Sequence, residues 1–152
     1  MIDWSNWKPG DAASADIATE SGWLKSGLKM QMLDFPGSEN VDLDAVSKIV
    51  GSGLRVGAAE AKTVKQVVTE LGIDKDQATF LVHFAMCLAA SQRDMETSGD
   101  ILSKMEWDGD GCCDRCQKNH GKSVKIGSKF PSGHYMPPGC EYCTCCLLPV
   151  IE

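Results

Sequence analysis

Apolar and small residues recur at steps of three and four along residues 41–71, which is the spacing of one buried stripe on a helix. The stripe comprises Leu43, Val46, Val50, Leu54, Gly57, Ala61, Val64, Val68 and Leu71. Gly51 and Gly53 lower the helix propensity of its middle by up to about 1 kcal/mol each relative to alanine. We therefore expect a kink or a break into two helices near these glycines, and we expect Gly72 to end the stripe.

A second helix is expected to begin at residues 74–75. Asp74 and Gln77 have the spacing of a capping box, in which the carboxylate accepts hydrogen bonds from the first free amides of the helix. Apolar residues then continue the helical spacing at Ala78, Leu81, Ala85, Leu88, Ala89, Met95 and Leu102. The stripe extends toward Met105, with an irregularity at residues 98–99. Two antiparallel helices joined by a short turn are the simplest way to bury both stripes.

Residues 1–40 contain three tryptophans but few other residues suited to a core. The tryptophans are Trp4, Trp7 and Trp23. A helix is expected near residues 11–33, although Gly22 and Gly27 interrupt it. Aromatic enrichment is typical of protein interfaces, so one interpretation makes the three tryptophans partner-binding residues of a docking segment. The other interpretation packs them on the protein's own helices.

The composition changes beyond Trp107, where a turn-rich run at residues 108–111 opens a stretch that is poor in helix formers. We therefore expect a helical body at residues 41–106, built as a hairpin or small bundle. A separate small module is expected at residues 107–152. The predicted fold class is mainly α.

Two short extended segments are expected in this C-terminal module. Val124 and Ile126 alternate with polar residues and glycine, as in a half-buried strand. Residues 147–151 form an apolar terminal segment. Because proline lacks a backbone N–H, Pro149 restricts that segment to the edge of a sheet.

Seven of the eight cysteines fall within the C-terminal module, and they include two C-x2-C pairs that 23 residues separate. The pairs are Cys113 with Cys116 and Cys140 with Cys143. Two residues between cysteines let both sulfurs face one point from a tight turn, and a tetrahedral zinc ion then ties two such turns together. Four thiolates leave no open position on the ion for a reactive water. We therefore predict a small zinc-bound β/loop knuckle with a structural zinc, in a protein that is not an enzyme.

The module carries further metal-binding residue types, namely Cys112, Cys145, Cys146, His120 and His134. Among them, Cys145 is the substitute we expect for Cys143 as the fourth ligand. An iron–sulfur cluster or disulfides remain open as alternatives to zinc. The eighth cysteine, Cys87, lies in an apolar helical stretch, where a free thiol usually acts as a small buried hydrophobic residue.

The formal net charge of -6 and the pI of about 5.0 argue against a basic body that coats nucleic acid. Five basic residues nevertheless cluster in the module: Arg115, Lys118, Lys122, Lys125 and Lys129. They either form a solvated face or contact phosphates or an acidic protein surface. The chain has no apolar run near the roughly 20 residues of a membrane span and opens without a basic and apolar leader, so we expect neither a membrane partner nor export.

Four stretches of the C-terminal half follow one another in a distinctive order. They are Trp107-Asp108-Gly109-Asp110, Cys113-Asp114-Arg115-Cys116, Asn119-His120-Gly121-Lys122-Ser123-Val124 and Cys140-Glu141-Tyr142-Cys143-Thr144-Cys145-Cys146-Leu147-Leu148-Pro149-Val150. In this order, and in its apolar tail with a proline, the stretch from about Val82 to Glu152 resembles the C-terminal part of the phage Mu F-like minor head proteins. These proteins are also called the phage head morphogenesis family.

The resemblance has several departures. The family's C-x-C motif falls on Cys143 and Cys145, so Cys140 stands where the family has a histidine, which exchanges one zinc ligand for another. The family's His-Pro pair is absent, and Thr144 replaces the arginine between the last cysteines. The resemblance covers less than half of the chain, and residues 1–81 match no motif of the family.

The resemblance implies a structural component of a bacteriophage virion, made in the host cytoplasm. Its expected partners are other virion proteins: the portal, the capsid interior or the head-to-tail connector. Several copies in one assembly are expected, and contact with DNA stays open. The alternative function is a zinc-ribbon nucleic-acid-binding or regulatory module that uses the five basic residues on phosphates.

Overall fold

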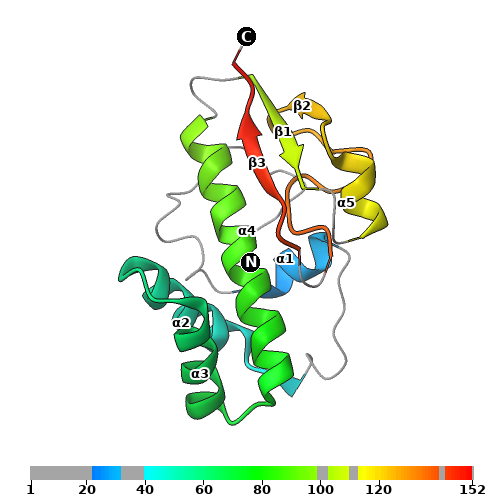
Figure 1. Cartoon of the computed structure of the whole chain (residues 1–152). Coiled ribbons are helices and arrows are strands. Elements are labelled where there is room, and N and C mark those ends of the chain that lie inside the picture. Colours follow the sequence, from blue (N-terminus) through cyan, green and yellow to red (C-terminus); the bar gives the residue numbers. More distant parts are fainter. Residues whose placement is uncertain (1–21, 32–39, 99–102, 110–112, 141–142, 152) are drawn as a thin grey trace.

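The structure is a computed structural model of the chain, and it describes residues 22–31, 40–98, 103–109, 113–140 and 143–151, with only the backbone described at 96–98. Helices dominate this part of the chain, and a small antiparallel sheet lies at the C-terminal end (Figure 1). The predicted fold class, mainly α with a small cysteine-bearing β/loop module, is confirmed.

The first apolar stripe forms two helices, α2 (Leu43–Arg55) and α3 (Glu60–Leu71). The break between them lies at residues 56–59, where Gly57 adopts a φ of 68°. The predicted break into two helices is therefore confirmed, but it comes later in the chain than expected.

The two glycines that suggested the break lie inside α2. A Cβ atom on Gly53 would lie 2.8 Å from the Thr63 Oγ1 atom of α3. Gly53 therefore serves the close approach of the two helices, and Gly51 is likewise buried within α2. Loss of helix propensity at a glycine is small, and tertiary packing overrides it here.

The long helix α4 (Lys75–Ser98) begins where the capping pattern predicts. The Asp74 Oδ2 atom accepts hydrogen bonds from the backbone N–H groups of Asp76 at 3.0 Å and Gln77 at 3.4 Å. The preceding helix α3 ends at Gly72, whose φ of 65° is the left-handed conformation common at helix ends. Both boundary predictions are confirmed.

The expected extension of the α4 stripe to Met105 is wrong. Residues Lys104–Asp108 form strand β1, in which Met105 and Trp107 are buried and Glu106 between them is partly exposed. An alternation with period two buries one face of a strand, and Met105 satisfies that pattern as well as the helical one. The expected boundary at residue 106 therefore falls inside a strand.

Strand β1 is the centre of a three-stranded sheet with the order β2-β1-β3. Both β2 (Ser123–Lys125) and β3 (Cys146–Pro149) pair with it in antiparallel fashion. The strand expected around Val124 and the edge position expected for the proline-containing segment are confirmed. In Figure 1, β3 runs beside α4, whereas β2 lies on the far side of β1.

Helix α1 (Trp23–Met30) is the described part of the helix that was expected near residues 11–33. Gly27 lies within it, and a Cβ atom there would stand 2.5 Å from the Leu88 Cδ2 atom of α4. The glycine that weakens the helical pattern therefore allows α1 to pack closely on α4.

Trp23 belongs to the core. Its side chain has no exposed surface, and its Nε1 atom donates a hydrogen bond of 2.9 Å to the Gln92 Oε1 atom of α4. The partner-binding interpretation is therefore wrong for Trp23, because a buried indole with a satisfied N–H belongs to the protein's own packing. Trp4 and Trp7 lie outside the described residues.

The apolar core is continuous from the helices into the C-terminal module. Trp23 and Phe84 of the helical body belong to the same buried cluster as Trp107, Cys116 and Cys143 of the module. The module is therefore packed against the body through a shared core. Within the described part of the chain, no helix combines the length and apolarity that a membrane span requires.

Candidate metal centre

The thiols of the C-terminal module converge around Cys116, which lies on the short helix α5 (Asp114–Asn119). Its Sγ atom is 3.5 Å from that of Cys113, the N-cap residue of α5, and 3.7 Å from that of Cys143. A tetrahedral ion with Zn–S bonds of about 2.3 Å separates its sulfur ligands by about 3.8 Å. Both distances therefore fit the edges of a tetrahedral thiolate site.

The sulfur atoms form two overlapping groups of three, each with all its sulfurs within 4.8 Å of one another. One group is Cys113, Cys116 and Cys140, and the other is Cys116, Cys143 and Cys145. All four predicted ligands and the predicted substitute thus lie in one cluster that could hold a metal ion. The remaining described thiol of the module, Cys146, is exposed and belongs to neither group, and Cys112 lies outside the described residues. None of the described cysteines is part of a disulfide, which the sequence had left open as an alternative to zinc.

Two glycines bring backbone close to the sulfurs. A Cβ atom on Gly139 would lie 3.1 Å from Cys116 Sγ and 3.2 Å from Trp107 Cζ2. A Cβ atom on Gly109, whose φ is 133°, would lie 2.6 Å from Cys145 Sγ. These positions leave space for sulfur atoms that a larger residue would displace.

Hydrogen bonds favour the thiolate form of two predicted ligands. The thiols of Cys116 and Cys87 lower the pKa of Cys143 far below its ordinary value, and the backbone N–H groups of Gly139 and Cys145 lower it further. The Cys145 N–H lies 3.4 Å from Cys143 Sγ. Because a metal binds the thiolate and not the thiol, these donors prepare Cys143 for coordination.

Cys113 is prepared in the same way. Burial raises the pKa of Cys113, but hydrogen bonds from the backbone N–H groups of Cys116 and Arg115, together with interactions with the Cys116 and Cys140 side chains, outweigh it. The net effect is a pKa below the ordinary value. Amide groups that donate to thiolate sulfur also hold the side chain in place for a metal ion.

Cys145 differs because burial raises its pKa to about 12, and the nearby charge of Cys143 adds to this effect. The indole N–H of Trp107 acts in the opposite direction and lowers the pKa of Cys145. Among the described residues, the buried Trp107 Nε1 atom has no hydrogen-bond acceptor of good geometry. A metal ion on Cys145 would convert its thiol to a thiolate, which is a strong acceptor beside this N–H.

A residue that the sequence did not indicate as part of this site is Cys87 of α4. Its Sγ atom lies 3.8 Å from the Cys145 carbonyl oxygen. Cys87 is partly buried, and its thiol contacts the backbone beside the cysteine cluster. His83, one helical turn earlier, places its Nε2 atom 2.8 Å from the Cys143 carbonyl oxygen and its Nδ1 atom 2.9 Å from Glu60 Oε1. The sequence signal that could have indicated this contact is the spacing of His83 and Cys87. Four positions apart, they lie on one face of an otherwise apolar stretch of helix.

The two histidines of the module have other roles. His134 is buried, with Nδ1 2.7 Å from Ser132 Oγ and Nε2 2.9 Å from the Gln31 carbonyl oxygen. Burial lowers the pKa of His134 and so favours its neutral form. The Nδ1 atom of His120 accepts a hydrogen bond of 3.1 Å from the Gly109 N–H. Neither histidine belongs to the two sulfur groups.

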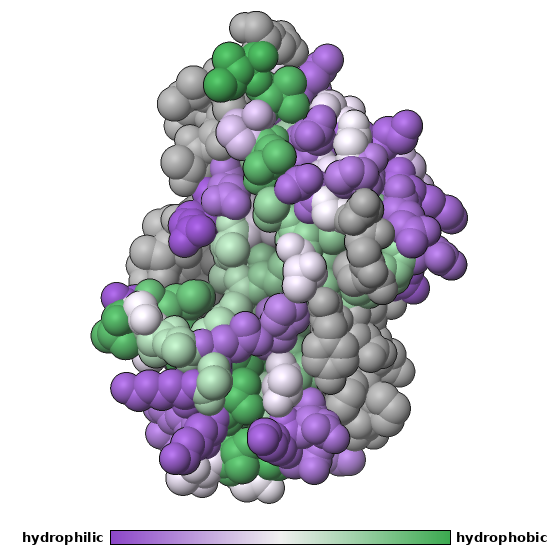
Figure 2. Space-filling view, in the orientation of Figure 1, coloured by the Kyte–Doolittle hydropathy of each residue, from purple (hydrophilic) through white to green (hydrophobic). Residues whose placement is uncertain are grey.

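The five basic residues of the module are all exposed: Arg115, Lys118, Lys122, Lys125 and Lys129. Figure 2 shows hydrophilic surface on the side of the molecule where α5 and β2 lie. Two of these side chains also have contacts within the module. Arg115 Nη1 donates a hydrogen bond of 3.4 Å to the Gly139 carbonyl oxygen, and Lys129 Nζ lies 5.5 Å from the centre of the Tyr135 ring.

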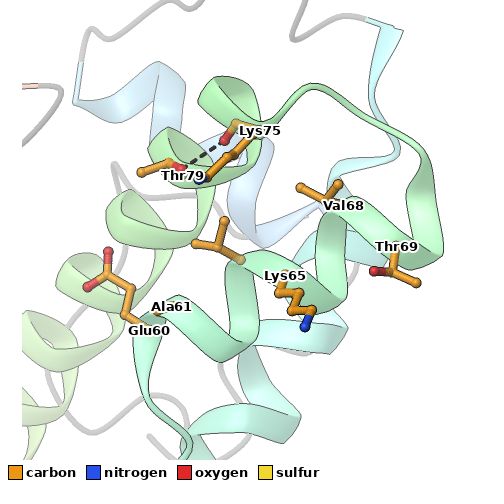
Figure 3. A pocket seen from close by; sticks show the side chains of 8 residues that line it. Glu60, Ala61, Lys65, Val68, Thr69, Lys75 and Thr79 are labelled. Atoms are coloured by element: carbon orange, nitrogen blue, oxygen red, sulfur yellow. Dashed lines mark hydrogen bonds between the residues drawn. The ribbon is translucent and has the colours of Figure 1, made fainter.

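Two grooves meet at Glu60. One has a volume of about 350 Å³ and lies between α4 and the cysteine cluster, where His83, Cys87, Cys143 and Cys145 line it. The other has a volume of about 740 Å³ and lies between α3 and α4 (Figure 3). The walls of this second groove are mainly apolar, and none of the residues that line it is a cysteine or histidine. Of these two grooves, only the first borders the cysteine cluster.

Comparisons of the chain with models of protein families, with curated proteins and with solved structures gave no match.

Proposed function

We propose that a structural zinc ion on Cys113, Cys116, Cys140 and Cys143 stabilises the C-terminal module, and that the protein has a structural role and is not an enzyme. The observation that carries this proposal is the pair of sulfur distances at the buried Cys116, 3.5 Å to Cys113 and 3.7 Å to Cys143. Each thiol that binds releases its proton to water, and the ion then joins α5 to the segment before β3.

The composition of the module supports the need for such an ion. Among its described residues, the buried large apolar side chains are Met105, Trp107, Phe130, Met136 and Leu147. So small a set buries little apolar surface, and a small domain of this kind gains much of its stability from a metal. Structural zinc contributes about 10–16 kcal/mol of apparent binding free energy in zinc-finger peptides at neutral pH.

A pair of variants tests the metal centre. Cys116→Ala removes the thiol shared by both sulfur groups, and we expect it to lose bound zinc and to lower the melting temperature. Cys146→Ala changes an exposed thiol outside both groups and should keep the wild-type zinc content. Elemental analysis gives the zinc content of the wild type and the two variants, and thermal unfolding gives their melting temperatures. Wild-type zinc content in Cys116→Ala would contradict the proposal.

At the level of biological role, we propose a component of a bacteriophage virion: a minor head, portal-associated or head-to-tail connector protein. The order of motifs from Trp107 to Val150 supports this role. The test is co-purification of the zinc-loaded protein with portal, capsid and connector proteins from the same genome. Failure to associate with any of them would count against the virion role and leave the metal centre untouched.

A nucleic-acid-binding or regulatory module is the second candidate function. It is supported by the exposure of the five basic residues on the metal-bearing module. Binding through phosphates should weaken steeply as salt rises from about 50 to about 200 mM, because counterions are released on binding. Exchange of Lys122 and Lys125 for glutamine should reduce the salt dependence, whereas Lys62→Gln on the distant α3 should not. Absent or salt-insensitive DNA binding would exclude this function.

A further inference from the structure

The end of helix α1 holds the segment that leads to Cys140. From its hydrogen bonds we infer that Gln31, the C-cap residue of α1, is a positioning residue of the metal centre. Its contacts set the path of residues 134–138, and that path places Cys140 for the ion. This inference rests on the proposed metal centre and makes its affinity for zinc dependent on the N-terminal helix.

Gln31 contacts every second residue of this segment. Its Nε2 atom donates hydrogen bonds to the carbonyl oxygens of Met136 and, at 2.9 Å, of Pro138. Its own carbonyl oxygen accepts a hydrogen bond of 2.9 Å from the His134 Nε2 atom. One residue at the end of a helix thus fixes three points of a segment that lies 103 to 107 positions later in the chain (Figure 1).

The backbone of this segment requires donors from elsewhere. Residues 134–138 form neither helix nor strand, and residues 136–139 are buried. Pro137 and Pro138 have no backbone N–H with which to join a sheet. A buried carbonyl oxygen without a donor destabilises the fold. The side-chain amide of Gln31 therefore satisfies acceptors that the segment itself leaves open.

The side chain of Gln31 is suited to this contact and to little else. Gln31 has no exposed surface, and its Oε1 atom has no hydrogen-bond partner among the described residues. Burial of an unpaired amide oxygen is unfavourable, and an apolar side chain of the same size would avoid it. The property that only the amide supplies here is the pair of donors on Nε2.

The segment held by Gln31 continues directly into the sulfur cluster. Gly139 follows Pro138, and a Cβ atom on Gly139 would lie 3.1 Å from Cys116 Sγ. The next residue, Cys140, forms the first sulfur group with Cys113 and Cys116. A shift of the segment would therefore move Cys140 relative to the other two sulfurs. Groups that orient ligands without touching the ion typically change metal affinity about 10–100-fold.

The test is the affinity for zinc, measured by competition with a chelator well below the melting temperature. Gln31→Met keeps the length of the side chain but removes both donated hydrogen bonds, and we expect it to weaken zinc binding about 10-fold. Gln92→Met is the matched control. Gln92 is another fully buried glutamine that contacts α1, but it does so through the Trp23 Nε1 atom. This variant should lose stability and keep the zinc affinity of the wild type.

The visible absorption spectrum of the cobalt(II)-loaded protein adds a readout of the thiolate geometry. We expect it to change in Gln31→Met and to stay the same in Gln92→Met. Wild-type zinc affinity in Gln31→Met would overturn the inference, and so would equal losses in the two variants, since those would reflect general destabilisation. Zinc bound by the wild type would leave the proposed centre in place in either case. A wild-type chain that binds no zinc would overturn the centre and the inference together.

Hydrogen exchange in the wild type tests the same link without a variant. Coupling between two sites is reciprocal, so bound zinc should slow exchange of the Gln31 side-chain amide. The measurement is made where the chelated protein keeps its helical circular dichroism signal. Chelation should then speed exchange at Gln31 by a larger factor than at Gln92. An equal change at the two glutamines would contradict the positioning role.

Discussion

At the scale of single residues, the cysteine cluster depends on neighbours that are not ligands. Gly139 and Gly109 keep side-chain atoms away from the sulfurs of Cys116 and Cys145. Backbone N–H groups donate to Cys113 and Cys143 and favour their thiolate forms. The site therefore consists of ligands and of backbone that is shaped around them, and substitutions in that backbone should affect metal binding.

Gly139→Ala should weaken metal binding. The added methyl group would lie 3.1 Å from Cys116 Sγ and 3.2 Å from Trp107 Cζ2, so the ligand or the indole must shift. Overpacking of this kind typically costs about 1–3 kcal/mol. Competition with a chelator measures the loss of affinity. Gly121→Ala is the control. A Cβ atom at Gly121 would meet no atom within 4 Å, and the φ of 74° strains only the local backbone. The metal affinity of this variant should therefore equal that of the wild type.

His134 should make the stability depend on pH. Burial lowers its pKa below the ordinary value of 6.5, so the unfolded chain binds a proton below about pH 6.5 that the folded chain does not. The free energy of unfolding should then fall as the pH falls through that range, by at most about 1.4 kcal/mol per pH unit. Chemical denaturation of the wild type and of His134→Gln measures this slope. If the free energy of unfolding changed equally with pH in the wild type and in His134→Gln, His134 would not be a source of the pH dependence.

At the scale of elements, local signals predicted the helix boundaries well and long-range contacts poorly. Asp74 and Gly72 act through neighbours in sequence, so their spacing was enough to place the end of α3 and the start of α4. Met105 fitted a helical and a strand pattern equally, and only pairing with β2 and β3 decides for the strand. The contact of the Cys87 thiol with the Cys145 carbonyl oxygen spans 58 positions of the chain, so local spacing could not predict it.

Asp74→Ala should destabilise the protein through α4. The carboxylate satisfies two backbone N–H groups at the first turn, and loss of such a cap costs about 0.5–2 kcal/mol. Denaturant unfolding measures the change. Asp76→Ala in the same turn removes an exposed charge without removing the cap, so a loss as large as that of Asp74→Ala would contradict the capping role.

At the scale of the whole molecule, the metal centre and the helical body share one core. Trp107 and the buried cysteines belong to the cluster that also contains Trp23 and Phe84. Spacing in the sequence was sufficient to single out four cysteines that the structure brings into the sulfur cluster, because C-x2-C pairs are a local pattern. It could not show that α4 reaches the same site through His83 and Cys87, since that contact arises only from the packing of the helix against β3.

Metal removal should therefore affect the entire protein. Because the core is continuous, a chelator should lower the temperature at which the helical circular dichroism signal is lost, as well as loosening the module. A module that unfolded alone, with the helical signal melting at an unchanged temperature, would show that the two parts are energetically independent.

The most direct test of the metal centre is the zinc content of the purified protein, measured by elemental analysis together with thiol titration before and after chelation. We predict at least one zinc ion per chain and a set of cysteines that react only after the chelator has been added. A protein without metal, whose cysteines react equally with and without chelator, would contradict the account.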